Sequence, residues 1–283
     1  MILTDFEYVR PSTLGEATAL LAAPGSRVLA GGQSLLVDLK TGEGTASRLV
    51  DLRGVTALRG IRRTDGGGLR IGALTTLAEL VADPAVRAQA PALAEAARAN
   101  GDPQVRNLGT VGGNLAATER PTDLPPAVLA AGATLHVGRH RGQSTVRADD
   151  YARDGLPEGS VITAIELPAP APGEHSAFEK TADRASRYPV CAVAVRVTRD
   201  TTRPDDGLTG LRIAVTGATA RVTRLTGVER LLTGRAPDTE EVLAAFRAQP
   251  EEFFTPGRGT SAEYLRHLAG VLTARALSRA TSI

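Results

Sequence analysis

Hydrophobic positions in the first part of the chain alternate between helical and strand spacing. The apolar run at 27–30 predicts a short buried strand, 34–39 a helical turn and 49–52 a second strand. Apolar residues also recur on one face of an earlier helix, which ends before Pro24-Gly25: Leu14, Ala17, Leu20 and Leu21. We therefore expect a small α/β lobe at the start of the chain.

The pattern continues with a glycine turn at 65–68 and a strand at 69–73. Thr76 precedes a helix at 77–81, and Glu79 follows three residues later, so we expect a capping box. Further helix is expected over 85–99, interrupted at Pro91. An extended polar segment and a glycine-rich loop then lead to a helix over 124–131.

Strands dominate the pattern after residue 131, and two helices end it. The linker-like stretch 168–173 is either a domain linker or a long connection between strands, and we expect a domain change near residue 175. The expected strands lie at 134–137, 161–166, 177–180, 192–197 and 211–215, and the helices at 239–248 and 261–278.

Composition narrows the class of protein. The chain has 283 residues, 42% of them hydrophobic, with a net charge of +2, which suits a folded enzyme of one large or two smaller domains. Cys191 is the only cysteine, so the chain has no disulfide framework and no iron–sulfur cluster of its own. The histidines show no metal-ligand spacing, and we expect no metal site.

Three further features concern location and partners. The first residues lack the basic and apolar regions of a signal peptide, and no apolar run approaches the roughly 18 residues of a membrane span. We therefore expect a cytoplasmic protein without a membrane span. The arginine-rich region 53–70 has no interleaved aromatics for base stacking, so we expect a solvated surface and no nucleic-acid partner.

Residues 30–35, the first glycine loop, carry the first candidate chemistry. A strand that runs into Gly31-Gly32, with a helical turn directly after, brings backbone N–H groups toward a phosphate oxygen. Gln33 and Ser34 could add side-chain donors. The segment fits neither the Rossmann nor the P-loop fingerprint, and a plain turn is the alternative.

Residues 110–114, the second glycine loop, repeat these residue types. Thr110 supplies a hydroxyl, Gly112 and Gly113 leave the backbone accessible, and Asn114 supplies an amide. The two loops could close on one pyrophosphate from opposite sides, or they could be unrelated turns. If they bind it, valine at Gly112 or Gly113 should abolish binding with little loss of fold.

Sequence strings along nearly the whole chain resemble the FAD-binding subunits of molybdenum hydroxylases of the xanthine dehydrogenase type. The most specific string is Gln104-Val105-Arg106-Asn107-Leu108-Gly109-Thr110-Val111-Gly112-Gly113-Asn114-Leu115-Ala116. Supporting strings are Phe6-x-Tyr8-x-Arg10-Pro11, Leu69-Arg-Ile-Gly-Ala73 with Thr76-Leu77, Phe178-x-Lys180 and Ser261-Ala262-Glu263-Tyr264-Leu265-Arg266.

The resemblance implies an α+β fold in which a two-lobed FAD domain of the vanillyl-alcohol-oxidase (PCMH-like) type precedes a smaller C-terminal α+β domain. The FAD domain would span 1–175, with lobes at about 1–55 and 56–175, and the C-terminal domain 176–283. Non-covalent FAD would be lined at its pyrophosphate and ribityl chain by Ala30, Gly31, Gly32, Gln33, Ser34, Leu35, Thr110, Gly112, Gly113 and Asn114.

Four more residues are implied nearer the flavin. Asp123 would accept a hydrogen bond at the sugar-phosphate or flavin end, or it would cap the following helix. Lys180 would place a positive charge near the ring, or it would be a solvated lysine at a strand end. Ile162 and Tyr188 would pack near the isoalloxazine, with ordinary core and half-buried roles as the alternatives.

The family also implies a division of labour, in which this chain's FAD passes electrons to NAD, oxygen or a quinone. Molybdopterin would lie on a large subunit and two [2Fe–2S] clusters on a small subunit, in a dimer of heterotrimers. We expect no catalytic side chain here, since the redox chemistry belongs to the cofactor. The alternatives are a stand-alone FAD-dependent oxidase or dehydrogenase and a non-catalytic nucleotide-binding protein.

Three departures from the family pattern mark places of interest, the first being Gln33-Ser34 in place of pairs such as Thr-Asp or His-Ser. Glu119-Arg120-Pro121-Thr122-Asp123 replaces the commoner Ser-Pro-x-x-Asp, with the proline one place later. The segment 184–189 is also atypical, and in the family this region controls access to the flavin. Acceptor choice is therefore open.

Overall fold

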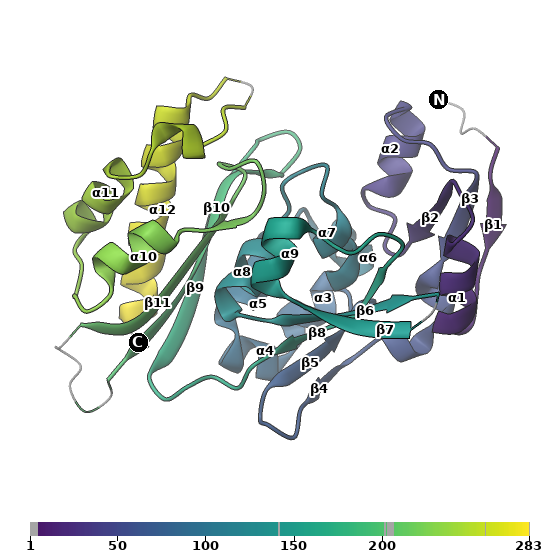
Figure 1. The fold of residues 1–283 in the computed structure, drawn as a ribbon, viewed down its shortest axis with the longest axis horizontal. Helices are drawn as coiled ribbons and strands as arrows, with labels where there is room; N and C mark the ends of the chain where they lie inside the picture. The colour runs from purple at the N-terminus through teal and green to yellow at the C-terminus, as the bar shows by residue number, and fades with distance from the viewer. Residues whose placement is uncertain (1–4, 141, 201, 203–206, 258, 283) are drawn as a thin grey trace.

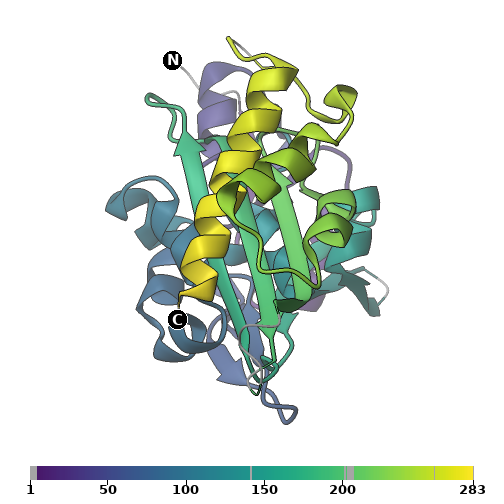
Figure 2. The same ribbon diagram turned by 90° about the vertical axis from the view of Figure 1, so that its left-hand side faces the viewer.

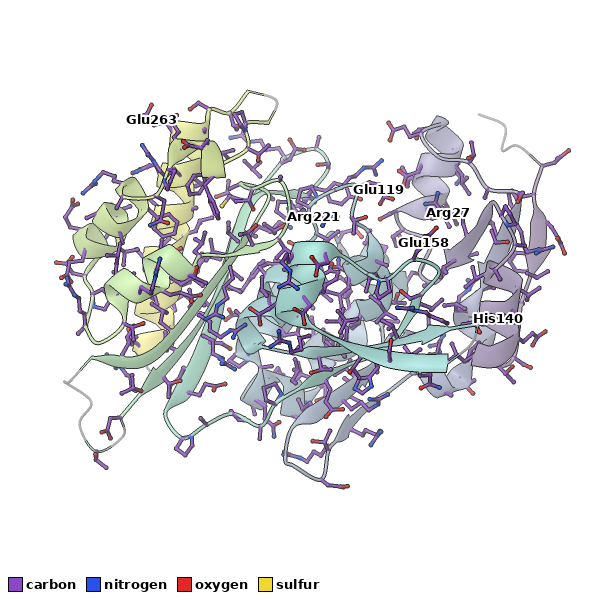
Figure 3. All side chains as sticks on the ribbon, viewed as in Figure 1. Arg27, Glu119, His140, Glu158, Arg221 and Glu263 are labelled. Carbon is purple, nitrogen blue, oxygen red and sulfur yellow. The ribbon has the colours of Figure 1, made fainter. Side chains whose placement is uncertain are left out.

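Three β-sheets follow one another along the chain in the computed structural model, which describes residues 5–140, 142–200, 202, 207–257 and 259–282. Figure 1 shows the small N-terminal sheet at one end, the middle sheet at the centre and the C-terminal sheet at the other end. Side chains fill the spaces between the layers (Figure 3). The α+β class predicted from the sequence is confirmed.

The N-terminal sheet has three parallel strands in the order β1-β3-β2. Parallel strands need crossover connections, and here two short helices provide them. The elements are β1 (Glu7–Val9), α1 (Leu14–Leu21), β2 (Ser26–Leu29), α2 (Leu35–Thr41) and β3 (Arg48–Asp51).

The middle sheet has five antiparallel strands in the order β4-β5-β8-β6-β7. Its strands are β4 (Ile61–Arg63), β5 (Leu69–Gly72), β6 (Thr134–Arg139), β7 (Gly142–Arg147) and β8 (Val161–Leu167). A run of helices separates β5 from β6, and one helix follows β7. They are α3 (Leu77–Ala82), α4 (Pro84–Gln89), α5 (Pro91–Ala99), α6 (Pro103–Leu108), α7 (Val111–Ala116), α8 (Leu124–Ala131) and α9 (Ala148–Asp154).

The C-terminal sheet is an antiparallel meander covered by helices on both faces. Figure 2 shows α12 lying across one face, and α5 and α8 pack against the strands from the other side. Its elements are β9 (Glu174–Ala182), β10 (Pro189–Arg199), β11 (Leu208–Thr216), β12 (Thr223–Arg224), α10 (Thr226–Leu232), α11 (Thr239–Arg247) and α12 (Ala262–Thr281).

The end of α8 is anchored to the C-terminal sheet by two arginines. Arg212 donates to the carbonyl of Leu129 at 2.9 Å, and Arg196 donates to the carbonyl of Ala131 at 2.8 Å. Guanidinium groups at a helix C-terminus satisfy its free carbonyls and its dipole. Since α8 also belongs to the core of the middle sheet, the two sheets share this helix as a common wall.

The sequence located most of these elements, and local signals explain the successes. Thr76 and Glu79 form the expected capping box of α3, and Pro91 separates α4 from α5. The extended polar segment expected after residue 99 is wrong, because Asp102 caps a helix with Pro103 at its first position. The glycine-rich loop expected at 110–114 forms the N-cap and first turn of α7. Elements with few apolar positions were missed, namely β1, β4, β7, β12, α9 and α10.

Candidate cofactor-binding site

The first glycine loop leaves the end of β2 with its N–H groups free. Among the described residues, the backbone N–H groups of Gly31 to Leu35 donate no hydrogen bond. Gly32 has a φ of 72°, which an L side chain rarely adopts. The Gln33 side chain donates to the carbonyl of Gly31 at 3.2 Å and so bends back over the loop. The loop therefore offers donors that an anionic oxygen could use.

The N–H groups of the second glycine loop are already paired. Val111 donates to the carbonyl of Thr75 at 3.0 Å, and Gly112 donates to the carbonyl of Ala73 at 2.8 Å. Gly113 donates to the Thr110 hydroxyl at 3.1 Å, which caps α7. The N–H of Asn114 donates to the Thr110 carbonyl at 2.9 Å. These bonds fix the second glycine loop to the segment after β5, so this side of the candidate site is rigid.

The two loops meet, although some 80 residues separate them. A Cβ added to Gly31 would overlap the carbonyl oxygen of Leu108 and lie 2.9 Å from the Cα of Gly109. A Cβ added to Gly113 would lie 3.9 Å from the Cβ of Ala30. Gly31 thus lets the two backbones touch, and Gly113 leaves a narrow cradle toward Ala30 that a side chain at position 113 would fill.

Asn114 takes the helix-cap role that the position of Asp123 suggests. Asp123 precedes α8 but makes no side-chain cap bond, so the helix-cap interpretation is wrong. Asn114 is the cap instead, since its side-chain oxygen accepts from the N–H of Leu124 at 3.0 Å. Its carbonyl also accepts from the Thr122 hydroxyl at 2.8 Å. Asn114 therefore connects the second glycine loop to the start of α8.

Asp123 and Lys180 form a buried ion pair beside this connection. Their side chains are 2% and 6% exposed, with Nζ 2.6 Å from Oδ1. Asn100 donates to the other carboxylate oxygen at 2.7 Å, and Lys180 also donates to the carbonyl of Ala99 at 3.2 Å. Burial raises the pKa of Asp123 more than Lys180 and Asn100 lower it. Lys180 is not a solvated lysine at a strand end.

Two further expected residues and the single cysteine differ in how far they are buried. Ile162 is 4% exposed within the core of the middle sheet, and Leu35 packs half-buried near Leu39. Cys191 is fully buried, and burial raises the pKa of its thiol to about 12, so the thiol stays protonated. Among the described residues, no group of three His, Cys, Asp or Glu side chains could hold a metal ion.

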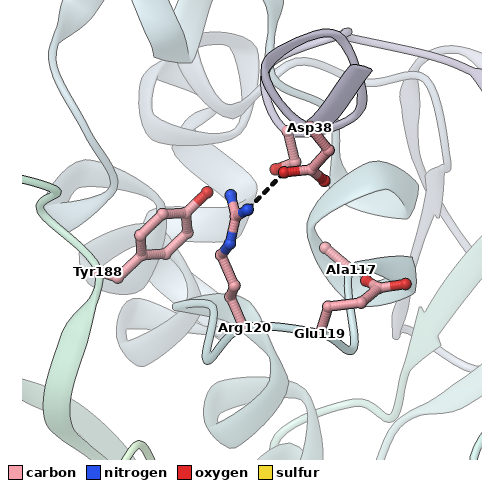
Figure 4. A pocket seen from close by; sticks show the side chains of 6 residues that line it. Asp38, Ala117, Glu119, Arg120 and Tyr188 are labelled. Carbon is pink, nitrogen blue, oxygen red and sulfur yellow. Dashed lines mark hydrogen bonds and ion pairs between the residues drawn. The ribbon is translucent and has the colours of Figure 1, made fainter. Parts of the chain in front are cut away.

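A small pocket opens beside the first glycine loop (Figure 4). Tyr188, expected near the isoalloxazine, is half-buried at its edge. No role was expected for Arg120, although it lies in a stretch that departs from the family pattern. The lining residues are Ser34, Asp38, Ala117, Glu119, Arg120 and Tyr188.

The described residues include no helix long and apolar enough to span a bilayer.

Comparisons with known proteins cover nearly all of the chain. A family model for the FAD-binding domain in molybdopterin dehydrogenase matches residues 4–170, and one for the CO dehydrogenase flavoprotein C-terminal domain matches 176–280. The carbon monoxide dehydrogenase medium chain of Hydrogenophaga pseudoflava is 36% identical, covering 99% of this chain and 98% of that one.

Two further similarities agree with these matches. The carbon monoxide dehydrogenase medium chain of Afipia carboxidovorans is 34% identical, again over 99% of this chain and 98% of that one. A solved structure of the Hydrogenophaga pseudoflava carbon monoxide dehydrogenase lacking the Mo-pyranopterin moiety of its cofactor superimposes with a TM-score of 0.90. It is 34% identical and covers 100% of this chain and 99% of that one.

Proposed function

The chain belongs to the family of FAD-binding flavoprotein subunits of molybdopterin dehydrogenases, and on this premise we propose that the cradle between its glycine loops holds FAD. The protein is an oxidoreductase subunit of the molybdenum hydroxylase type. Its FAD would receive electrons from iron–sulfur clusters of a partner subunit and pass them to a terminal acceptor. FAD supplies the redox chemistry once bound.

The close approach of the two loops is the observation that carries the proposal. Gly31 touches the backbone at Leu108 and Gly109, and Gly113 faces Ala30, so no side chain occupies the space between the loops. The N–H groups of residues 31–35, which donate to no described residue, belong to the loop that makes this approach. A pyrophosphate needs both close backbone approach and unpaired donors, and these residues fit that need.

Within this proposal, the chain's residues bind and orient the cofactor. The N–H groups from Gly31 to Leu35 donate to the pyrophosphate, with Ser34 beside them. Gly112 and Gly113 leave room for it, and Thr110 and Asn114 hold the wall in place. The paired charges of Asp123 and Lys180 line the flavin end, with Ile162 and Tyr188 as packing surfaces.

The partners follow from the family. A medium subunit of this type works with a large and a small subunit, and we assign molybdopterin to the large one and two [2Fe–2S] clusters to the small one. We further propose a dimer of heterotrimers in the cytoplasm, without nucleic acid. We also propose an FAD domain at 1–175, with lobes at about 1–55 and 56–175, and a C-terminal domain at 176–283.

An absorption spectrum of the purified chain tests cofactor binding. We expect a flavin spectrum and FAD as the compound that heat releases, identified by chromatography. Gly113→Val should abolish FAD retention, because the side chain would enter the cradle, while circular dichroism stays unchanged. Gly66→Val is the matched control, since a Cβ there meets nothing within 4 Å. Full FAD occupancy in Gly113→Val would refute the cradle.

A second experiment tests the assembly. The chain is tagged and isolated from cells that carry its neighbouring subunits, and the complex is analysed for bound metals. We expect a molybdenum-containing chain and a cysteine-rich chain in equal amounts with it. Isolation of the tagged chain alone, with FAD and its own substrate oxidation, would favour the stand-alone oxidase instead.

A further inference from the structure

Arg120 connects three segments that lie far apart in the sequence (Figure 4). Its guanidinium pairs with Asp38 on α2 and, at 2.6 Å, with Glu43 in the turn after that helix. The same group lies over the ring of Tyr188, 5.8 Å from its centroid, as a cation–π contact. Neighbouring Glu119 points away from it. Arg120 therefore bridges the N-terminal lobe and the loop between β9 and β10.

The β9–β10 loop is built to hold Tyr188 in one position. One oxygen of Asp183 accepts from the N–H groups of Ala185 and Ser186, at 3.0 and 2.7 Å, and also from the Ser186 hydroxyl. Arg187 has a φ of 64°, the only positive value among the described non-glycine residues. That conformation is strained for an arginine and persists only when its surroundings impose it. The strain directly precedes Tyr188.

These contacts line the small pocket beside the first glycine loop and are partly exposed to water. Ser34, Asp38, Arg120 and Tyr188 all line that pocket. The side chains of Arg120, Asp38 and Glu43 are 31%, 21% and 64% exposed, so water competes for each of their charges. Partly exposed ion pairs are individually weak, and a small set of them can break and form again without unfolding the chain.

We propose that Arg120 is a clasp on the cofactor pocket, whose contacts with Asp38, Glu43 and Tyr188 limit the rates at which FAD enters and leaves. The inference rests on the proposed function, which places FAD between the glycine loops, because Ser34 of the first glycine loop also lines this pocket. A clasp slows entry and exit together, since both need the same opening. A direct contact between Arg120 and the cofactor would instead slow exit alone.

The test compares both rates in wild-type protein and in Arg120→Ala. Uptake is followed by the change in flavin fluorescence when apoprotein is mixed with FAD, and release by the fluorescence recovered on dilution of the holoprotein. We expect both rates to rise about tenfold, as for the loss of a small ion-pair network, with the dissociation constant changing less than about threefold. Faster release with unchanged uptake, or two unchanged rates, would overturn the clasp.

Asp38→Asn opens the same clasp from its other side and decides between the two mechanisms. We expect both rates to rise again, and the double variant to gain no more than the stronger single variant. If Arg120 is a direct cofactor ligand, Asp38→Asn should free it for FAD and slow release. That result would also overturn the clasp.

Arg247→Ala is the matched control, since Arg247 pairs with Glu240 on α11 and lines no part of the pocket. Its rates should equal those of the wild type, and circular dichroism should confirm that all variants are folded. A wild-type chain that binds no FAD would refute the proposed function itself. A wild-type chain that binds FAD, with rates insensitive to Arg120 and Asp38, would refute only the clasp.

Discussion

The two glycine loops have similar composition and opposite hydrogen bonding. The N–H groups from Gly31 to Leu35 are free among the described residues, whereas those from Val111 to Asn114 all have partners within the chain. Glycine serves a different purpose in each. In the first loop Gly32 permits a left-handed turn, and in the second Gly112 allows the backbone to pack on Ala73.

The two glycine loops therefore have different roles: the first can bind an anion, and the second supports the fold around it. The first glycine loop can stabilise negative charge, because unpaired N–H groups gain most from an anion. The second glycine loop defines the space, because its backbone cannot move without breaking bonds to Ala73 and Thr75. A Gly-Gly pair in a sequence therefore does not reveal whether its amides bind a ligand or hold the fold.

The largest effect is expected where the loops touch. In Gly31→Ala, the new Cβ would overlap the backbone at Leu108, and backbone atoms cannot turn aside as a side chain can. We expect a loss of about 3 kcal/mol in the free energy of unfolding and loss of FAD binding. Urea denaturation and FAD titration measure the two quantities. Gly66→Ala, in open space, should change neither. A stable, FAD-binding Gly31→Ala would show that the loops do not depend on this contact.

Neighbouring glycines of the second glycine loop should respond differently to alanine. A Cβ on Gly112 would lie 2.7 Å from the Cβ of Ala73, in the packed interior, whereas a Cβ on Gly113 would meet chiefly the Thr110 hydroxyl at 2.9 Å. We expect Gly112→Ala to cost about 1–3 kcal/mol of unfolding free energy. Gly113→Ala should cost much less and should mainly weaken FAD binding. Equal losses of unfolding free energy in the two variants would contradict the view that Gly112 supports the fold and Gly113 borders the cofactor site.

The expectation from the sequence, that valine at Gly112 or Gly113 would abolish binding with little loss of fold, therefore changes for Gly112. At Gly112 the larger side chain would press on Ala73, so loss of FAD could follow from loss of packing. Gly113 is the informative position, because its Cβ direction leads toward Ala30 and the space between the loops.

The smallest effects are expected for the two hydroxyl residues. Thr110 caps α7, so Thr110→Val should cost about 1 kcal/mol of unfolding free energy and leave FAD affinity nearly unchanged. Ser34 makes no cap bond to α2, so Ser34→Ala should change stability by less than about 0.5 kcal/mol. It should instead weaken FAD binding. Thermal unfolding measures the stability of both variants, and FAD titration measures their affinity. If Thr110→Val weakened FAD binding and Ser34→Ala lowered stability, the roles of the two loops would be exchanged.

Local sequence signals predicted the elements, and distant contacts determined the site. The strand, glycines and helix of the first glycine loop were readable because they lie within a dozen residues. The hydrogen bond from Gly112 to Ala73 could not be predicted from the sequence, because nothing near either residue indicates that they meet. The cap on α8 shows the same limit, since Asn114 displaces Asp123 from a position that aspartate usually fills.

Lys180 and Arg120 show why ion pairs between residues distant in the sequence could not be predicted. Lys180 was readable as a cation near the flavin, but its partner Asp123 lies 57 residues earlier and balances its charge. For Arg120 the sequence indicated only that its segment departs from the family pattern. Its partners Asp38 and Tyr188 lie on opposite sides of it in the sequence, and only the folded chain assembles them.

The shared helix α8 has a consequence for how such subunits evolve. Its carbonyls at Leu129 and Ala131 are satisfied by Arg212 and Arg196 from the C-terminal sheet, and its apolar side lies in the core of the middle sheet. A recombination that joins the first part of one subunit to the last part of another would have to match α8 to new strands. The two family modules are thus coupled through α8, and exchanging one of them alone should weaken the contact between them.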